Sequence, residues 1–351
     1  MDPSMIWEWV LKSVIILLGS TAGFAYMTLY ERRALARIQA RIGPNRVGPQ
    51  GLLQPVADGI KLIFKEELVP EKADKLIFIL APVITVIPAL IILAVVPVGG
   101  TINLFGRQVA LQLADLNVGI LYIMAVTSIS VYGITLAGWS SNNKYATLGG
   151  LRSTAQMISY EIAMGFSFIV PVLLAGSMSL STIVNAQKDI WFMLLQPGAA
   201  LILFISMLAE TNRAPFDMPE AEQELTAGYH TEYSGMKFAL FFMAEYIKII
   251  AVSVIFATLF MGGYYLPFQS VLENFFASVS WLSWINVVLP YLGPVILFAK
   301  VIFLLFIFIW VRATWPRIRY DRLMSFGWKV TFPLALLSVL VTAAAVLLVG
   351  G

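Results

Sequence analysis

The chain has 351 residues, of which 59% are hydrophobic and only 12% charged, and its formal net charge is +3. Soluble domains carry about twice that charged fraction, and several apolar stretches exceed the ~20 residues that cross a bilayer, so a soluble globular protein is excluded. The apolar runs are continuous rather than alternating, which excludes a β-barrel. The absence of cysteine excludes disulfides, iron–sulfur clusters and zinc–thiolate sites in this chain, and a single histidine, His230, excludes bis-histidine haem ligation.

Apolar runs bounded by charged residues, Pro and Gly predict an all-α polytopic membrane protein with about eight transmembrane helices in a single membrane domain, 1–351. The expected spans are 6–29, 76–97, 117–138, 155–176, 190–210, 239–261, 290–311 and 328–349.

The Lys and Arg residues gather in alternate connections between these spans. Four connections hold 18 of the 23: 30–75, 139–154, 211–238 and 312–329. By the positive-inside rule these connections face the cytoplasm, and both termini lie on the non-cytoplasmic face of a bacterial cell (inner) membrane.

The segment 50–66 predicts a separate, amphipathic helix. Its apolar residues fall on one helical face: Leu52, Leu53, Val56, Ile60, Ile63 and Phe64. Such a helix is too short and too polar to span, so we expect it in the cytoplasmic interface, where it would guide a lipid-soluble substrate. A soluble linker helix is the alternative.

Ionisable residues inside spans are the first candidates for function, because a charge in the bilayer is expensive. The candidates for a proton conduit are Glu161, Glu210, Glu245, Lys248 and Lys300. Three carboxylates from three helices share the cytoplasmic half of the membrane, which predicts a proton conduit opening toward the cytoplasm. The alternative is a set of structural ion pairs with the two lysines. The outer half holds no comparable acids, so the sequence indicates no complete proton path in this chain.

The cytoplasmic connection 211–238 is rich in acids. Pro215 and Pro219 prevent the preceding helix from continuing. Five carboxylates fall within 16 residues: Asp217, Glu220, Glu222, Glu224 and Glu232. A solvated acidic face is the alternative to a functional loop. The spacing is unlike that of metal ligands, so no metal site is predicted.

Two long segments resemble the signature regions of a known family. They are ERRALARIQARIGPNRVGPQGLLQPVADGIKLIFKE (31–66) and AETNRAPFDMPEAEQELTAGYHTEYSGMKFALFFMAEY (209–246). The family is that of the H-type membrane subunit of proton-pumping NADH:quinone oxidoreductase, respiratory complex I, also known as the mitochondrial subunit 1 family.

The resemblance implies a place at the junction of the peripheral arm and the membrane arm, where the family forms the mouth and lower wall of the quinone chamber. It assigns a basic run to that chamber and to contacts with peripheral subunits: Glu31, Arg32, Arg33, Arg37, Arg41, Arg46 and Asp58. It places Arg213 and the five loop carboxylates at the quinone cavity, and it places Glu161, Glu210 and Glu245 in the proton conduit.

The resemblance also implies cofactors and partners. The chain would bind no cofactor alone, would meet quinone as substrate, and would rely on FMN and iron–sulfur clusters in partner subunits. Its partners would be other membrane-arm subunits, peripheral quinone-module subunits and the lipid bilayer, with no nucleic acid. The sequence thus predicts a subunit that couples quinone reduction to proton translocation. The alternatives are the homologous subunit of a membrane-bound hydrogenase, an ion-coupled secondary transporter, which should show inverted repeats, and a structural anchor.

Overall fold

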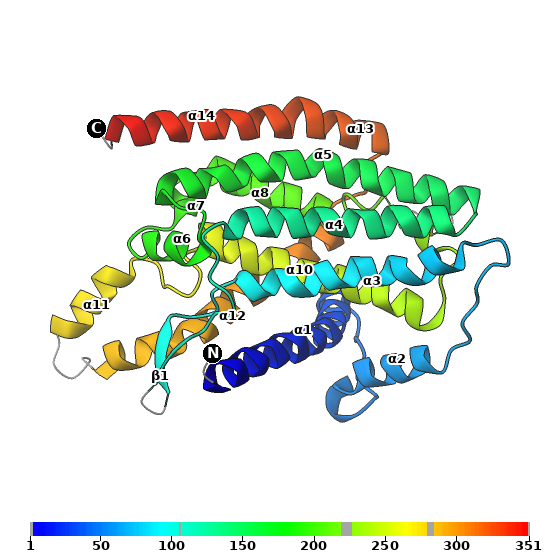
Figure 1. The fold of residues 1–351 in the computed structure, drawn as a ribbon, viewed down its shortest axis with the longest axis horizontal. Helices are drawn as coiled ribbons and strands as arrows, with labels where there is room; N and C mark the ends of the chain where they lie inside the picture. Colours follow the sequence, from blue (N-terminus) through cyan, green and yellow to red (C-terminus); the bar gives the residue numbers. More distant parts are fainter. Residues whose placement is uncertain (1–2, 105–106, 219–226, 279–283, 350–351) are drawn as a thin grey trace.

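The apolar runs form helices because a helix satisfies every backbone N–H and C=O group inside a bilayer. The computed structural model describes residues 3–104, 107–218, 227–278 and 284–349, and its long helices lie side by side in one bundle (Figure 1). Within these ranges seven helices are long and apolar enough to cross a membrane, and an eighth apolar helix is shorter. The predicted all-α polytopic membrane fold is therefore confirmed.

The bundle helices follow the chain order of the predicted spans. They are α1 (Pro3–Ile38), α3 (Lys75–Ile91), α4 (Gly119–Ser140), α5 (Lys144–Ala175), α8 (Pro197–Glu210), α10 (Gly235–Phe260), α12 (Trp284–Thr314) and α14 (Phe332–Val349). Short helices connect them: η1 (Pro49–Gly51), α2 (Gln54–Ile63), η2 (Ile92–Val95), α6 (Leu180–Ala186), α7 (Phe192–Leu195), η3 (Gly228–His230), α11 (Gln269–Ser278), α13 (Tyr320–Phe326) and the π-helix η5 (Gly327–Thr331).

A small hairpin interrupts the helical pattern between η2 and α4. Strands β1 (Thr101–Leu104) and β2 (Arg107–Ala110) pair antiparallel, with Thr101 opposite Ala110. It lies at the same end of the bundle as the two chain termini (Figure 1).

The span expected at 190–210 is divided. Helix α7 ends at Leu195, and Pro197 begins α8, because proline has no N–H to continue a helix but fits its first turn. Helix α8 has 14 residues, ~21 Å at 1.5 Å per residue, which is shorter than the ~30 Å hydrocarbon core. Leu203, Met207 and Ala209 of α8 are fully buried, so protein rather than lipid surrounds much of this helix.

Helix α5 forms the central wall of the bundle. It begins at Lys144 rather than at the expected residue 155, because Asn143 caps it and accepts a hydrogen bond from the Tyr145 N–H at 2.9 Å. It ends at Gly176, whose φ of 66° is the left-handed conformation favoured at helix C-termini. It packs against α4, α8 and α14 (Figure 1).

Helix α10 packs against α1, α3 and α12 on the other side of the bundle. Its residues Ile247, Ala257, Leu259 and Phe260 are fully buried, so α10 belongs to the interior. Helices α1 and α14 lie at the outside of the bundle and expose most of their apolar side chains (Figure 1). Such exposed apolar faces suit lipid or partner subunits.

Candidate functional site

Arg213 lies at the centre of a buried ion-pair cluster that joins α1, α10 and α12. Its Nη1 is 3.1 Å from Oε1 of Glu31, and its Nε is 2.7 Å from Oε1 of Glu245. Its guanidinium carbon lies 4.4 Å from the centre of the Tyr246 ring. Arg312 forms a second ion pair with Glu31. We term Glu31, Arg213, Glu245, Tyr246 and Arg312 the Arg213 cluster.

The Arg213 cluster is electrically balanced, with two guanidinium and two carboxylate groups. The side chains of Arg213, Glu31 and Glu245 are 8%, 5% and 12% exposed, so each charge depends on its partners rather than on water. Burial by itself lowers the pKa of Arg213, but the charges of Glu245 and Glu31 outweigh it and hold that pKa above its ordinary value. Arg213 is therefore charged at every physiological pH.

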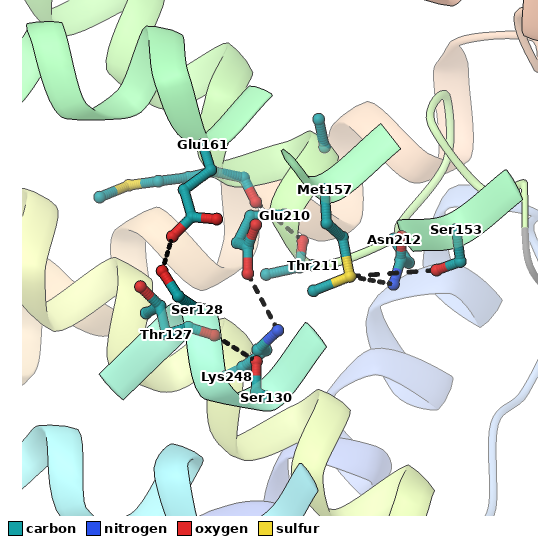
Figure 2. Close-up of polar contacts among 12 residues, drawn as sticks. Thr127, Ser128, Ser130, Ser153, Met157, Glu161, Glu210, Thr211, Asn212 and Lys248 are labelled. Atoms are coloured by element: carbon teal, nitrogen blue, oxygen red, sulfur yellow. Dashed lines mark hydrogen bonds and ion pairs between the residues drawn. The ribbon is translucent and has the colours of Figure 1, made fainter. Parts of the chain in front are cut away.

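A second cluster surrounds Glu210, the last residue of α8. The helix dipole disfavours a negative charge at this end, and Lys248 of α10 compensates, with its Nζ 3.0 Å from Oε1 of Glu210. Glu161 of α5 accepts a hydrogen bond from Ser128 of α4. Figure 2 shows Glu161 and Glu210 as neighbours, with Lys248 and Ser128 reaching them from other helices. We term Ser128, Glu161, Glu210 and Lys248 the Glu210 cluster.

The two clusters differ in charge balance. The Glu210 cluster has two carboxylates and one ammonium group, so its formal charge is −1 when all three are ionised, whereas the Arg213 cluster is neutral. One bound proton would neutralise the Glu210 cluster. Carboxylates that exchange a proton in this way are what proton transfer requires.

The chain connects the two clusters twice. Glu210 ends α8, and Arg213 lies three residues later in the connection that follows it. Glu245 and Lys248 are also three residues apart, on one face of α10, ~4.5 Å along the helix axis. A displacement of either element therefore reaches both clusters.

The basic run lies where α1 meets the amphipathic segment. Arg32 pairs with Asp58 of α2 at 2.7 Å, and Arg33 donates to the backbone oxygen of Gln50. Three further arginines are exposed: Arg37, Arg41 and Arg46. Their exposed guanidinium groups can meet another protein surface. Among the described residues, no hydrogen bond or ion pair joins these three arginines to the Arg213 cluster.

The amphipathic helix is present as α2, which is shorter than the predicted 50–66 because the chain before it forms the separate turn η1. Every apolar residue that the sequence assigned to its apolar face is exposed, from Leu52 at 44% to Phe64 at 85%. The side chain of Gln54 donates to Asp58 at 3.1 Å on the face that meets α1. An exposed apolar face beside an ion pair suits a membrane interface, where the helix is expected.

The acidic connection is held on both sides. Asp217 pairs with Arg317 at 2.8 Å, and Glu232 accepts from the Asn143 side chain at 2.6 Å. Tyr233 stacks on Phe78 with ring centres 4.0 Å apart. The three acids between these anchors lie outside the described residues: Glu220, Glu222 and Glu224.

Lys300 is apart from the carboxylates. Its Nζ donates to the backbone oxygens of Met261, Gly263 and Tyr265, at 2.5, 2.8 and 2.5 Å, and lies 4.4 Å from the centre of the Trp191 ring. These oxygens follow the C-terminus of α10, ~20 Å along the helix from Lys248. The structure thus brings Lys248 but not Lys300 to the acids, and Lys300 caps a helix.

His230 packs among aromatic rings. It lies in η3 against Tyr229, Phe238, Phe241 and Phe242. Neither ring nitrogen has a hydrogen-bond partner among the described residues, and burial lowers the pKa of His230 to about 3. Burial among aromatic rings therefore favours the neutral form of His230.

Several residues of these clusters did not stand out in the sequence. Arg312 belongs to a basic connection, Ser128 to an apolar span, and Tyr246 is one aromatic residue among many. Of these three residues, only Tyr246 could have been suspected from the sequence, because it follows the intramembrane acid Glu245. The pairing of Glu31 with Arg213 and Arg312 joins residues far apart in the chain, which local patterns do not reveal.

Comparison with known proteins gives long matches. A family model described as NADH dehydrogenase matches residues 11–343. The H-type subunit of NADH-quinone oxidoreductase from Protochlamydia amoebophila is 51% identical over 319 residues, 91% of this chain and 91% of that protein. The first H-type subunit of the same enzyme from Geobacter metallireducens is 53% identical over 319 residues, 91% and 90% of the two chains. Its subunit 8 from Thermus thermophilus is 50% identical over 343 residues, 97% and 88%.

Proposed function

Because this chain belongs to the NADH dehydrogenase family, as an H-type subunit of NADH-quinone oxidoreductase, we propose that it forms the mouth and wall of the quinone chamber and couples quinone reduction to proton translocation. The observation that carries this proposal is the pair of buried ion clusters, one neutral and one with an excess negative charge, joined by α10 and by the connection after α8. The names of the relatives favour this function over the hydrogenase and transporter alternatives.

The orientation of the chain follows from charge. Both termini lie at one end of the bundle, and α2 with the α4–α5 connection lies at the other (Figure 1). The second end carries the basic connections, so it faces the cytoplasm across a bacterial inner membrane. We place the peripheral quinone-module subunits, with FMN and iron–sulfur clusters, at this end, and other membrane-arm subunits beside the bundle.

The access route for quinone lies at α1 and α2. Quinone partitions into the bilayer, so its path begins at an apolar surface, and α2 exposes Val56, Ile60 and Ile63. The Arg32–Asp58 pair ties this surface to α1, whose Glu31 belongs to the Arg213 cluster. A quinone that enters along α2 thus arrives beside charged groups.

The chemistry requires both protons and charge compensation. Reduction of quinone to quinol takes up two electrons and two protons, and the electrons come from the partner subunits. A change of charge at the quinone acts on Arg213, which forms ion pairs with both Glu31 and Glu245. If Arg213 shifts, a buried carboxylate loses its cation and takes up a proton instead, because an unpaired buried charge costs several kcal/mol. Lys248 and Glu210 then receive the change through α10.

The acidic connection supplies the conformational element of this coupling. Its anchors are Asp217 with Arg317 on one side and Glu232 with Asn143 on the other. We expect a rearrangement during turnover to break the Asp217–Arg317 or the Glu232–Asn143 contact. Coupling of this kind requires such a two-state element.

The variant Glu161→Gln tests the conduit. Glutamine keeps the shape of the side chain and an oxygen that accepts from Ser128, but it cannot exchange a proton. We expect normal NADH oxidation with a hydrophilic acceptor that needs only the peripheral arm, and a severalfold loss of proton pumping coupled to quinone reduction.

The matched control is Glu273→Gln. Glu273 of α11 pairs with Lys188 at 2.6 Å, at the end of the bundle that holds the termini (Figure 1). This control should pump normally. Full pumping by Glu161→Gln would refute the conduit, and equal losses in both variants would assign the effect to assembly.

A further inference from the structure

Gln156 of α5 holds the backbone between the two clusters. Its side chain is fully buried. Its Nε2 donates to the backbone oxygens of Ala209 at 2.8 Å and Phe216 at 2.7 Å, and lies 3.3 Å from Oδ1 of Asn212. The first of these bonds goes to the last turn of α8, and the second goes to the connection that follows it.

The orientation of this amide is fixed by its partners. Two backbone carbonyls can only accept, so the NH₂ group and not the oxygen must face them. The two bonds close the stretch 209–216 into a loop against α5. That loop contains Glu210 of one cluster and Arg213 of the other.

Other contacts confirm that this loop has a defined shape. The Phe216 N–H donates to the Arg213 oxygen at 2.8 Å. Asn212 adopts a φ of 50°, a left-handed conformation that asparagine tolerates better than most residues. The Phe216 ring packs against Tyr160 on α5, at 5.5 Å between centres. The two Gln156 bonds therefore join α5 to a loop of defined shape and not to a loose segment.

Stability alone does not explain this glutamine. Its Oε1 is buried and has no hydrogen-bond partner among the described residues, and an unsatisfied buried acceptor destabilises a fold. By contrast Gln187, also fully buried, uses both ends of its amide. Its Nε2 donates to the Thr258 oxygen at 2.9 Å, and its Oε1 accepts from the N–H of Gly262 at 3.0 Å.

We propose that Gln156 is a positioning residue of the coupling path. By fixing the loop 209–216 it holds Arg213 between Glu31 and Glu245 while it holds Glu210 beside Lys248. The inference rests on the proposed function, because it assigns to Gln156 the alignment of the groups that transmit quinone reduction. Gln156 itself touches none of the ionised groups through its amide.

The test compares Gln156→Met with Gln187→Met in the complete complex. Methionine has a similar size but donates no hydrogen bond. We expect Gln156→Met to lower kcat for quinone reduction at least ~tenfold, as misplacement of reacting groups by about 1 Å does. KM for quinone should change little, because Gln156 does not contact quinone. Gln187→Met should keep kcat per assembled complex.

A second variant, Gln156→Glu, gives a readout that depends on protonation. A protonated glutamate donates one O–H to a backbone carbonyl, whereas an ionised one is repelled by both carbonyls. The ionisable groups around it are Glu210 and Arg213 on the loop and, one turn away on either side on α5, Arg152 and Tyr160. Quinone reduction by Gln156→Glu should therefore fall with rising pH relative to the wild-type complex.

The outcomes separate cleanly. A normal kcat in Gln156→Met, or equal losses in Gln156→Met and Gln187→Met, would overturn the inference. If Gln156→Met fails to assemble, a pH profile of Gln156→Glu parallel to the wild type would overturn it. Full pumping by Glu161→Gln would instead refute the proposed function, whatever Gln156 does.

Discussion

Removal of the Arg213 charge should destabilise the fold, chiefly because the buried carboxylate of Glu245 loses this cation. Arg213→Met takes away the guanidinium that lies 2.7 Å from Glu245 and 3.1 Å from Glu31. Glu31 keeps its ion pair with Arg312. Its negative charge is therefore still compensated in this variant, and it is destabilised less than the charge of Glu245. The ring of Tyr246 also loses the cation above it.

The size of the effect follows from burial. Breaking a buried ion pair on one side destabilises a protein by ~3–5 kcal/mol, since it leaves an uncompensated charge. A double variant, Arg213→Met with Glu245→Gln, removes both charges and should recover ~2–3 kcal/mol of that loss. Arg213→Lys keeps the charge but not the flat guanidinium that contacts both carboxylates and the ring, so it should lie between the wild type and Arg213→Met.

The assay measures assembly and coupling separately. Native gels of heated, purified complex give the temperature at which this chain dissociates, and proton pumping per NADH gives the coupling. We expect the double variant to assemble better than Arg213→Met while coupling stays low in both. A double variant no more stable than Arg213→Met would refute the charge compensation between Arg213 and Glu245.

Two further predictions concern residues outside the clusters. Lys300→Met leaves three backbone oxygens without the Lys300 donor, which should destabilise the complex by ~3 kcal/mol. The number of protons pumped per NADH should stay unchanged. A lower number in the assembled complex would contradict the capping role of Lys300. The pKa of His230 is lowered from 6.5 to about 3 by burial, so between those values the unfolded chain holds a proton that the folded chain does not, and stability falls as pH drops below 6.5. The change in the free energy of unfolding caused by His230→Phe should therefore be more stabilising by ~2 kcal/mol at about pH 5 than at about pH 8. An equal change at both pH values would contradict the claim that His230 is neutral in the folded chain.

The sequence predicted the bundle because its signal is local. Two apolar runs longer than 20 residues appear in the structure as α4 and α10 within a few residues of the expected bounds, whereas α3 ends at Ile91 and the chain continues as the 3₁₀ helix η2 to Val95. The exceptions have local causes: Pro197 divides one span, and the cap at Asn143 begins α5 early. The hairpin β1–β2 follows from pairing rather than from hydropathy, and four-residue strands carry little signal.

The sequence singled out some members of the two clusters. A charge inside the bilayer is costly, so the acids Glu161, Glu210 and Glu245 stand out in apolar spans, and the structure places them in the two clusters. Their partners depend on the packing of helices far apart in the chain, and hydropathy does not reveal that Lys248 rather than Lys300 meets Glu210. The division into two clusters was not foreseen, because it is set by the loop after α8.

Glutamine gives the weakest signal of all. A single Gln in an apolar span is compatible with many roles, and only the three acceptors around Nε2 of Gln156 reveal what it holds. The same argument applies to Ser128, whose partner Glu161 lies on the next helix.

The most direct test of the central claim removes both charges of the Glu210–Lys248 ion pair at once, so that neither is left without the other. The double variant Glu210→Gln with Lys248→Met keeps the packing of both side chains and is electrically neutral at this ion pair, which lies 3.0 Å apart in the structure. The measurement is the ratio of protons translocated to NADH oxidised, in liposomes that contain the purified complex. If the buried carboxylates couple quinone reduction to proton translocation, this ratio falls while NADH oxidation by a hydrophilic acceptor is unchanged. A wild-type ratio with full quinone reduction would contradict the account.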